Sequence, residues 1–225
     1  MLMPNGSTTS RVDSPLPVLG VLISGRGSNL QAIIGAIADG RLAARIGVVI
    51  SNRPDAGGLA HARAAGIESA VIEHRGFGSR AAFEEALVAR LAEAGVAVIC
   101  LAGFMRILSP FFLERAPGPV LNVHPSLLPS FPGVDAQAQA WNYGVTVAGA
   151  TVHLVTPELD AGPIVAQATV PVLDDDTPET LSARILVEEH RLYPEAIAKV
   201  VSTRWYIDGR RFVAGEVRRQ VPDAG

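Results

Sequence analysis

Apolar runs and amphipathic helical patterns alternate along residues 18–102, and this alternation limits the folds open to the chain. Val18–Ile23 is an uninterrupted apolar run, as expected of a strand buried on both faces of a sheet. Leu30–Ile37 follows it with apolar residues at helical spacing. Further strand and helix patterns follow in turn at 46–51, 58–65, 70–72, 79–94 and 96–102. This order predicts an α/β fold with a doubly wound, mostly parallel sheet.

The second half of the chain departs from this alternation. Val120–His124 has the composition of one more buried strand. The stretches 145–155 and 162–172 are rich in β-branched residues and have no helix between them. We therefore expect these two to pair antiparallel at the edge of the sheet. A C-terminal helix over about 177–200 begins at a Thr-Pro-Glu-Thr sequence that is typical of a helix start.

The predicted domain organisation is a single domain with short appendages. Residues 1–17 are polar and rich in proline and serine, without the apolar core of a signal peptide, so we expect a disordered extension. Residues 18–217 are predicted to form one domain that ends in a hairpin at about 204–214. Residues 218–225 are predicted to be a flexible tail.

Charge and composition narrow the classes of partner. The formal net charge of −3 gives no electrostatic case for nucleic acid or a membrane surface as the main partner. No apolar run approaches the ~18 residues of a membrane span. The single cysteine, Cys100, lies in an apolar run, which predicts a buried thiol and not a nucleophile. A reducing cytoplasm is the expected location, and the assembly is expected to be a monomer or a homodimer.

The five histidines lie far apart in the sequence, without HxH or HxxxH spacing, so no metal is expected. His153 falls within a predicted strand, where a hydrogen-bonded sheet histidine is a better interpretation than a metal ligand. No residue pattern therefore points to metal chemistry.

A glycine-rich loop, Ser24–Asn29, connects the first strand to the first helix. Gly25 and Gly27 allow a tight turn, and Ser28 and Asn29 add donors at the start of the helix. The loop lacks the third glycine of the dinucleotide fingerprint and the Gly-Lys-Ser/Thr of a P-loop. The pattern by itself is equally compatible with a phosphate site and with a plain turn in which Ser28 or Asn29 caps the helix.

Three polar residues are candidates for catalysis. Asn122 and His124 are two residues apart on a predicted strand, so their side chains share a face, and Asp160 lies in a turn downstream. A histidine transfers protons near neutral pH, a carboxylate fixes its tautomer, and an amide stabilises an oxyanion. No nucleophile elbow is present, which favours direct transfer of an acyl-type group to an amine. Spacing alone also allows purely structural roles, with His124 capping a turn and Asp160 forming one.

Helical periodicity assigns two acidic residues to opposite environments. In the helix over 79–94, Phe83 faces inward, and Glu84, with Glu85 and Arg90, faces outward. In the C-terminal helix, Glu189 follows Ile185 by one turn and therefore shares its inward face. A solvated acid at the edge of that helix is the competing interpretation.

Four segments together resemble the folate-dependent formyltransferase family, which has a Rossmann-like fold. They are Ile23–Leu30, Leu101–Leu108, Leu121–Pro129 and Glu158–Pro163. The resemblance covers about residues 18–200. The first segment, together with the short length of the chain, most resembles the phosphoribosylglycinamide branch of the family.

This resemblance implies transfer of the formyl group of 10-formyltetrahydrofolate, a co-substrate, to the amine of glycinamide ribonucleotide in purine synthesis, without a metal. The implied catalytic residues are Asn122, His124 and Asp160. The residues implied for the substrate phosphate and ribonucleotide are Gly27, Ser28, Asn29 and Glu189. The residues implied for folate are Arg80, Met105, Arg106, Ile107, Leu108, Asn122, Thr156, Pro157, Glu158, Leu159 and Asp160.

Some features separate the chain from its relatives. Asp135 stands near a position where family members carry a histidine, which puts a substrate contact from that loop in doubt. A cis peptide is expected at Leu128–Pro129. The alternatives are a formyltetrahydrofolate deformylase, which normally has an added N-terminal domain, a methionyl-tRNA formyltransferase, which normally has an added C-terminal barrel, and an inactive folate- or nucleotide-binding module.

Overall fold

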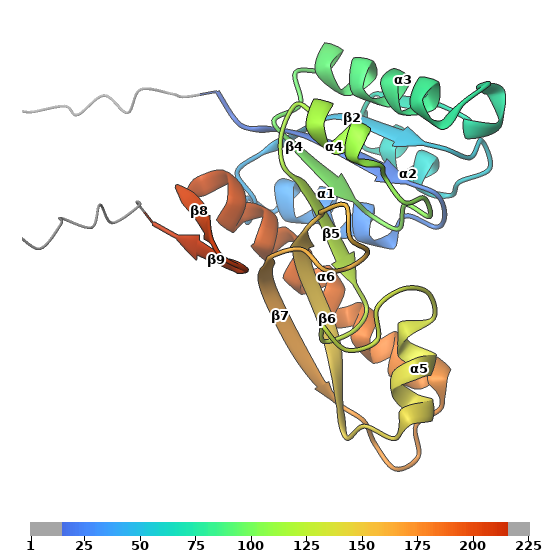
Figure 1. The fold of residues 1–225 in the computed structure, drawn as a ribbon, viewed down its shortest axis with the longest axis vertical. Helices are drawn as coiled ribbons and strands as arrows, with labels where there is room; N and C mark the ends of the chain where they lie inside the picture. Colours follow the sequence, from blue (N-terminus) through green and yellow to red (C-terminus); the bar gives the residue numbers. More distant parts are fainter. Residues whose placement is uncertain (1–14, 216–225) are drawn as a thin grey trace, which may run out of the picture.

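The computed structural model describes residues 15–215, and within them nine strands form one sheet in the order β3-β2-β1-β4-β5-β6-β7-β9-β8 (Figure 1). The elements are β1 (Val18–Ile23), α1 (Ser28–Ala38), β2 (Arg45–Ser51), α2 (Gly58–Ala64), β3 (Ser69–Val71), the 3₁₀ turn η1 (His74–Gly76), α3 (Arg80–Glu93), β4 (Val98–Leu101), α4 (Pro110–Arg115), β5 (Val120–His124), α5 (Ala136–Tyr143), β6 (Val147–Leu154), β7 (Ile164–Pro171), α6 (Pro178–Ser202), β8 (Trp205–Asp208) and β9 (Arg211–Ala214). The predicted tail over 218–225 and most of the predicted extension over 1–17 lie outside the described residues.

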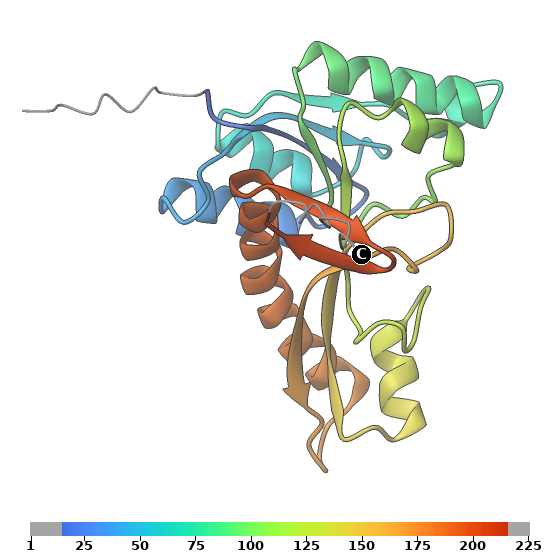
Figure 2. The ribbon, with the colours of Figure 1, turned by 60° about the vertical axis from the view of Figure 1, so that its left-hand side comes forward.

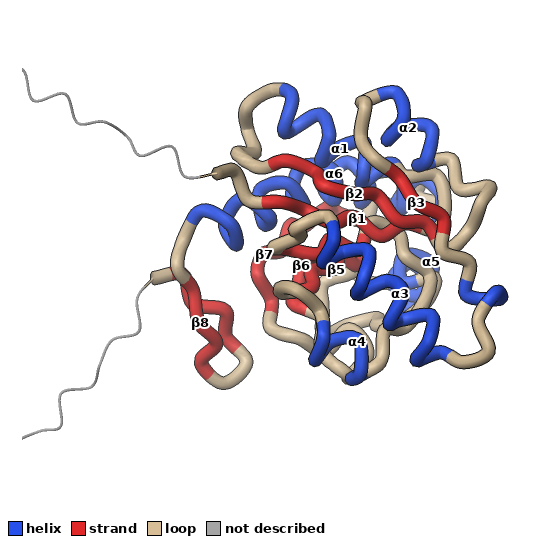
Figure 3. Tube along the Cα trace, turned by 90° about the horizontal axis from the view of Figure 1, so that it is seen from above, coloured by secondary structure: helices blue, strands red, loops and turns tan. Residues whose placement is uncertain are grey.

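The first half of the chain is the parallel part of the sheet. β1 pairs in parallel with β2 and β4, and β4 pairs in parallel with β5. Viewed from above, α1 and α2 lie on one side of these strands and α3 and α4 on the other (Figure 3). Leu19 and Val21 pack into the core on the first side and Leu22 into the core on the second. The unbroken apolar run of β1 is explained by this burial on both faces.

The second half reverses strand direction. β6 pairs antiparallel with both β5 and β7, which confirms the predicted pairing of 145–155 with 162–172. These strands are not at the edge of the sheet, however, because the β8–β9 hairpin continues it: Ile164 of β7 pairs with Arg211 of β9. Figure 2 shows the hairpin beside the end of α6. The predicted hairpin at 204–214 is confirmed.

Helix α6 packs on one face of the sheet and contacts both α1 and the strands β5, β6 and β7. It begins at a capping box formed by Thr177 and Thr180, as its sequence predicts. Its Tyr193 is fully buried, and the hydroxyl lies 3.0 Å from the carbonyl oxygens of both Leu101 and Leu121. One side chain thus holds β4 and β5 together. The neighbouring Cys100 is buried as predicted, and burial raises the pKa of its thiol to about 12.

Candidate active site

The end of β5 and the loop between β6 and β7 bring the predicted catalytic side chains together. His124 Nδ1 is 3.5 Å from Asp160 Oδ2, and these side chains are only 6% and 8% exposed. Burial alone would raise the pKa of this carboxyl, but the hydrogen bond from Gly133, the nearby ring of His153 and the charge of His124 hold it below its ordinary value. Asp160 is therefore an ionised carboxylate at neutral pH.

His153 belongs to this site, although its sequence pattern indicated only a sheet residue. The register of β5 and β6 places it opposite Asn122, and Asn122 Nδ2 is 3.3 Å from its Nε2. Its Nδ1 is 3.0 Å from the carbonyl oxygen of Leu154. A carbonyl only accepts, so the hydrogen-bond network assigns the proton to Nδ1 and makes Nε2 the acceptor from Asn122. His153 Nε2 is also 3.7 Å from Asp160 Oδ1.

The turn after β5 closes against the histidine and the carboxylate. His124 Nε2 is 2.9 Å from the carbonyl oxygen of Phe131, so both of its ring nitrogens face oxygen atoms. The imidazolium form satisfies both with N–H donors. The N–H of Gly133 donates to Asp160 Oδ2 over 2.8 Å. Phe131 and Asp135 have φ angles of 54°, a left-handed conformation that costs about 1–2 kcal/mol for residues with a Cβ.

The turn after β5 contains the Leu128–Pro129 peptide and Asp135, for which specific expectations came from the sequence. The Leu128–Pro129 peptide is cis, as expected. Asp135 is exposed and precedes α5 without a side-chain capping hydrogen bond. Among the described residues, no hydrogen bond or ion pair joins the Asp135 side chain to His124 or Asp160.

A cavity of about 400 Å³ lies beside Asn122 and Asp160. It brings together the predicted folate residues with the exception of Arg80: Met105, Arg106, Ile107, Leu108, Asn122, Thr156, Pro157, Glu158, Leu159 and Asp160. Met105 and Ile107 are 77% and 62% exposed, which is high for large apolar side chains. The cavity therefore has an apolar rim and polar groups at one end, as a site for a flat ring system requires.

Arg80 lies behind one wall of this cavity. Its Nε donates to Glu84 over 3.0 Å, and its Nη2 donates to the carbonyl oxygen of Ile107. The predicted outward orientation of Glu84 is wrong, because this residue is 1% exposed. Periodicity missed it because a polar partner on another segment, Ser109, receives the carboxylate.

The glycine-rich loop is built by close backbone contact. Gly27 has a φ angle of 79° and precedes α1. A Cβ on Gly27 would lie 2.4 Å from the Cα of Gly58, so a side chain does not fit there. Ser28 and Asn29 are the first helical residues, and the interpretation that either one caps the helix is wrong, since Gly27 holds the cap position. Their backbone N–H groups have no acceptor within the helix and are available to an anion.

Glu189 lies on the inward face of α6, as its spacing predicts, and contacts this loop. Asn29 Nδ2 donates to Glu189 Oε2 over 2.7 Å. Burial raises the pKa of Glu189, and the hydrogen bond from Asn29 opposes this only in part. Asn29 Oδ1 is buried without a hydrogen-bond partner among the described residues. A buried acceptor in this state is able to accept a hydrogen bond from a bound water or ligand.

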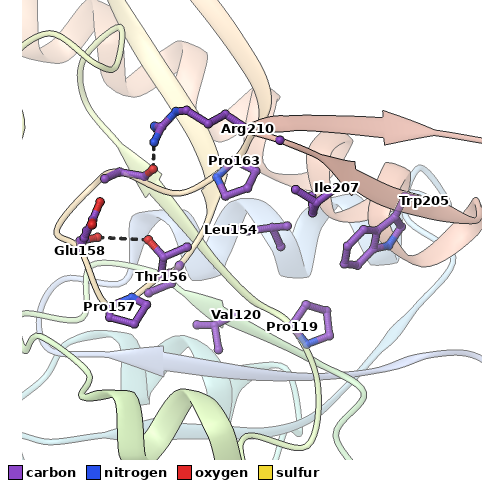
Figure 4. Close-up of a pocket in the computed structure, with 13 residues that line it drawn as sticks. Pro119, Val120, Leu154, Thr156, Pro157, Glu158, Pro163, Trp205, Ile207 and Arg210 are labelled. Carbon is purple, nitrogen blue, oxygen red and sulfur yellow. Dashed lines mark hydrogen bonds between the residues drawn. The ribbon is translucent and has the colours of Figure 1, made fainter.

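A second cavity, of about 660 Å³, lies between the 155–163 loop and the C-terminal hairpin. In Figure 4, Trp205 and Ile207 face the start of β5 across this space, and Arg210 reaches back to the loop. Arg210 Nη2 donates to the carbonyl oxygen of Ala161 over 2.7 Å. The residue after Asp160 is thus held by the hairpin.

Over residues 15–215, no group of three histidine, cysteine or acidic side chains is arranged to hold a metal ion. Of the helices in this range, none combines the length and apolar character that a bilayer crossing requires.

Comparison with known protein families shows the class of this protein. A sequence profile of the formyl transferase family matches residues 19–197. The chain therefore belongs to the formyl transferase family.

Relatives and solved structures refine this placement. The chain is 44% identical over 190 residues to phosphoribosylglycinamide formyltransferase of Escherichia coli, covering 84% of this chain and 87% of that protein. It is 45% identical over 203 residues to the human trifunctional purine biosynthetic protein adenosine-3, covering 89% of this chain but only 20% of that protein. The crystal structure of glycinamide ribonucleotide transformylase 1 from Symbiobacterium toebii is 51% identical, with a TM-score of 0.86 over 89% of this chain and 95% of that one.

Proposed function

We propose that the chain transfers the formyl group of 10-formyltetrahydrofolate to the amine of glycinamide ribonucleotide, as a cytoplasmic monomer or homodimer. The observation that carries the proposal is that Asn122 and Asp160 line one end of the 400 Å³ cavity, with His124 next to Asp160. The formyl transferase family and the formyltransferase activity of the Escherichia coli relative support the reaction class. No nucleic acid, membrane or metal has a part in the proposal.

The glycine-rich loop is proposed to bind the ribonucleotide. The N–H groups of Ser28 and Asn29 at the start of α1 would receive the phosphate, and Gly27 allows the backbone to approach it. The unpaired Asn29 Oδ1 and the carboxylate of Glu189 would accept hydrogen bonds from ribose hydroxyls. The folate ring would occupy the apolar-rimmed cavity, with the formyl group toward Asn122.

The reaction then proceeds by direct attack. The amine nitrogen bonds to the formyl carbon, and the carbonyl becomes an oxyanion that Asn122 Nδ2 and the His124 imidazolium stabilise. The attacking nitrogen loses a proton toward Asp160, through a water, and the folate nitrogen takes a proton as its bond to carbon breaks. His124 Nε2 donates to Phe131 in the structure, so this carbonyl has to release the ring for Nε2 to reach the oxyanion.

One assay separates this reaction from its alternatives. The protein is incubated with 10-formyltetrahydrofolate, with and without glycinamide ribonucleotide, and loss of the formyl group from folate is followed. Turnover that depends on the ribonucleotide is expected. Equal turnover without it would assign the chain to the deformylases, and no turnover in either mixture would favour a binding module.

A further inference from the structure

Helix α3 carries a buried carboxylate outside the catalytic group. The Glu84 side chain is 2% exposed. Its Oε1 accepts from Arg80 Nε over 3.0 Å and from the Ser109 N–H over 2.9 Å, and its Oε2 accepts from the Ser109 hydroxyl. Burying a carboxylate is unfavourable unless charged or polar donors compensate it. Both oxygens of Glu84 have such donors.

The partners of Glu84 belong to the wall of the folate-sized cavity. Ser109 directly follows Leu108 in the 105–108 segment that lines it. Arg80, besides its bond to Glu84, donates through Nη2 to the carbonyl oxygen of Ile107. One carboxylate therefore fixes the chain at residue 109 directly and at residue 107 through Arg80.

The same contacts orient the guanidinium of Arg80. Its Nε and Nη2 are bound on the protein side, while the side chain as a whole remains 49% exposed. Nη1 makes no hydrogen bond to the described residues, so its N–H groups are left for an external carboxylate. A cation whose conformation is already fixed loses less side-chain entropy when it binds an anion.

We propose that Glu84 is a positioning residue for the folate co-substrate. It holds Arg80 beside the 105–108 wall so that the guanidinium meets the carboxylates of the folate glutamate. The inference rests on the proposed function for its ligand. It adds that binding of the glutamate end of the ligand by Arg80 depends on a buried acid, Glu84, that does not itself contact the ligand.

Binding of two ligands tests the proposal. One is a 10-formylfolate analogue that carries the glutamate, and the other is the same analogue without it. For Glu84→Gln we expect the dissociation constant of the first ligand to rise about tenfold, the loss of one preorganised contact. The tail-less ligand should change less than ~3-fold, and glycinamide ribonucleotide should bind as before. Glu85→Gln, an exposed neighbour on the same helix, is the matched control and should leave both constants unchanged.

A double-mutant cycle separates positioning from general damage. In an Arg80→Ala background, Glu84→Gln should alter binding of the glutamate-bearing ligand by less than ~3-fold, because its effect passes through Arg80. Equal weakening of both ligands, or the same tenfold loss in both backgrounds, would overturn the proposal.

A second variant covers the case in which Glu84→Gln does not fold. Arg80→Lys keeps the charge but cannot contact Glu84 and Ile107 with a planar fork. It should lose the preference for the glutamate-bearing ligand, and wild-type preference would contradict the inference. Wild-type turnover with glycinamide ribonucleotide is measured in parallel. Absence of turnover together with Glu84-dependent tail binding would reject the reaction and keep the positioning role.

Discussion

The two ends of the proposed substrate site differ in the groups that form them. One, the backbone end, is the glycine-rich loop, and the other, the side-chain end, is the end of β5. At the glycine-rich loop, the shape comes from backbone: Gly27 at a φ angle of 79° against Gly58, and the N–H groups that begin α1. At the end of β5, the site comes from side chains: Asp160 lies near both His124 and His153, and Asn122 contacts His153. The first end has geometry suited to holding an anion, and the second has groups suited to moving a proton.

The buried acids at the two ends show the same contrast. The pKa of Asp160 lies below its ordinary value because its hydrogen bonds and the charge of His124 outweigh burial. The pKa of Glu189 lies above its ordinary value because burial outweighs the hydrogen bond from Asn29. The balance between burial and the donors around a carboxylate decides the sign of the shift. Substitutions at the two ends should therefore affect different quantities.

The largest effect is expected at the side-chain end. His124→Ala and Asp160→Asn should each lower kcat by at least ~10²-fold, because an oxyanion donor or a proton acceptor is lost. Binding of the ribonucleotide should remain near wild type when measured by calorimetry. Near-wild-type kcat in both variants would break the division of roles between the two ends.

The backbone end should respond in binding and stability. Gly27→Ala puts a Cβ into Gly58 at a left-handed φ angle, which should cost about 2 kcal/mol of unfolding free energy or more. The KM for the ribonucleotide should rise about tenfold with a smaller change in the KM for folate. Gly25→Ala is the control, since a Cβ there meets nothing within 4 Å. Equal effects of the two variants would show that backbone approach at residue 27 is unimportant.

The two acids should separate in the pH dependence of stability. Because the folded pKa of Glu189 is raised, its contribution to stability is present below its unfolded pKa and is lost as pH rises through the folded value. Glu189→Gln removes this loss, so its Tm relative to wild type should increase as pH rises above the ordinary pKa of a glutamate, on the order of 2–4 °C. Glu114→Gln, an exposed acid on α4, should show no such trend. A flat difference for Glu189→Gln would refute the raised pKa. Asp160 acts in the opposite window, with stability lost only as pH falls below its ordinary pKa.

The smallest effect is expected where the hairpin supports the side-chain end. Arg210→Ala removes the hydrogen bond to Ala161, an exposed contact that contributes about 1 kcal/mol at most. We expect kcat to fall no more than ~5-fold, with ribonucleotide KM unchanged. Steady-state kinetics on both substrates measure this. If the ribonucleotide KM rises by a larger factor than kcat falls, the hairpin acts on the glycine-rich loop and not on the end of β5, and the prediction is wrong.

The sequence allowed the fold to be predicted further than the site. The alternation over 18–102 and the β-branched stretches at 145–155 and 162–172 are local sequence patterns, so the strands and helices could be predicted from them. The Asn122, His124 and Asp160 assignments came from shared motifs. His153 needed the antiparallel register with β5, which lies between segments distant in the chain. Glu84 was misplaced because its burial depends on Ser109, 25 residues away.

The contact between Asn29 and Glu189 joins residues 160 positions apart in the chain. During synthesis, the glycine-rich loop is complete long before its acidic partner exists. A nascent or truncated chain that stops before α6 would carry an intact loop sequence, but the Asn29 side-chain amide would lack its acceptor, Glu189. The contact therefore makes the proposed ribonucleotide end of the site a property of the finished chain and not of its first fragment.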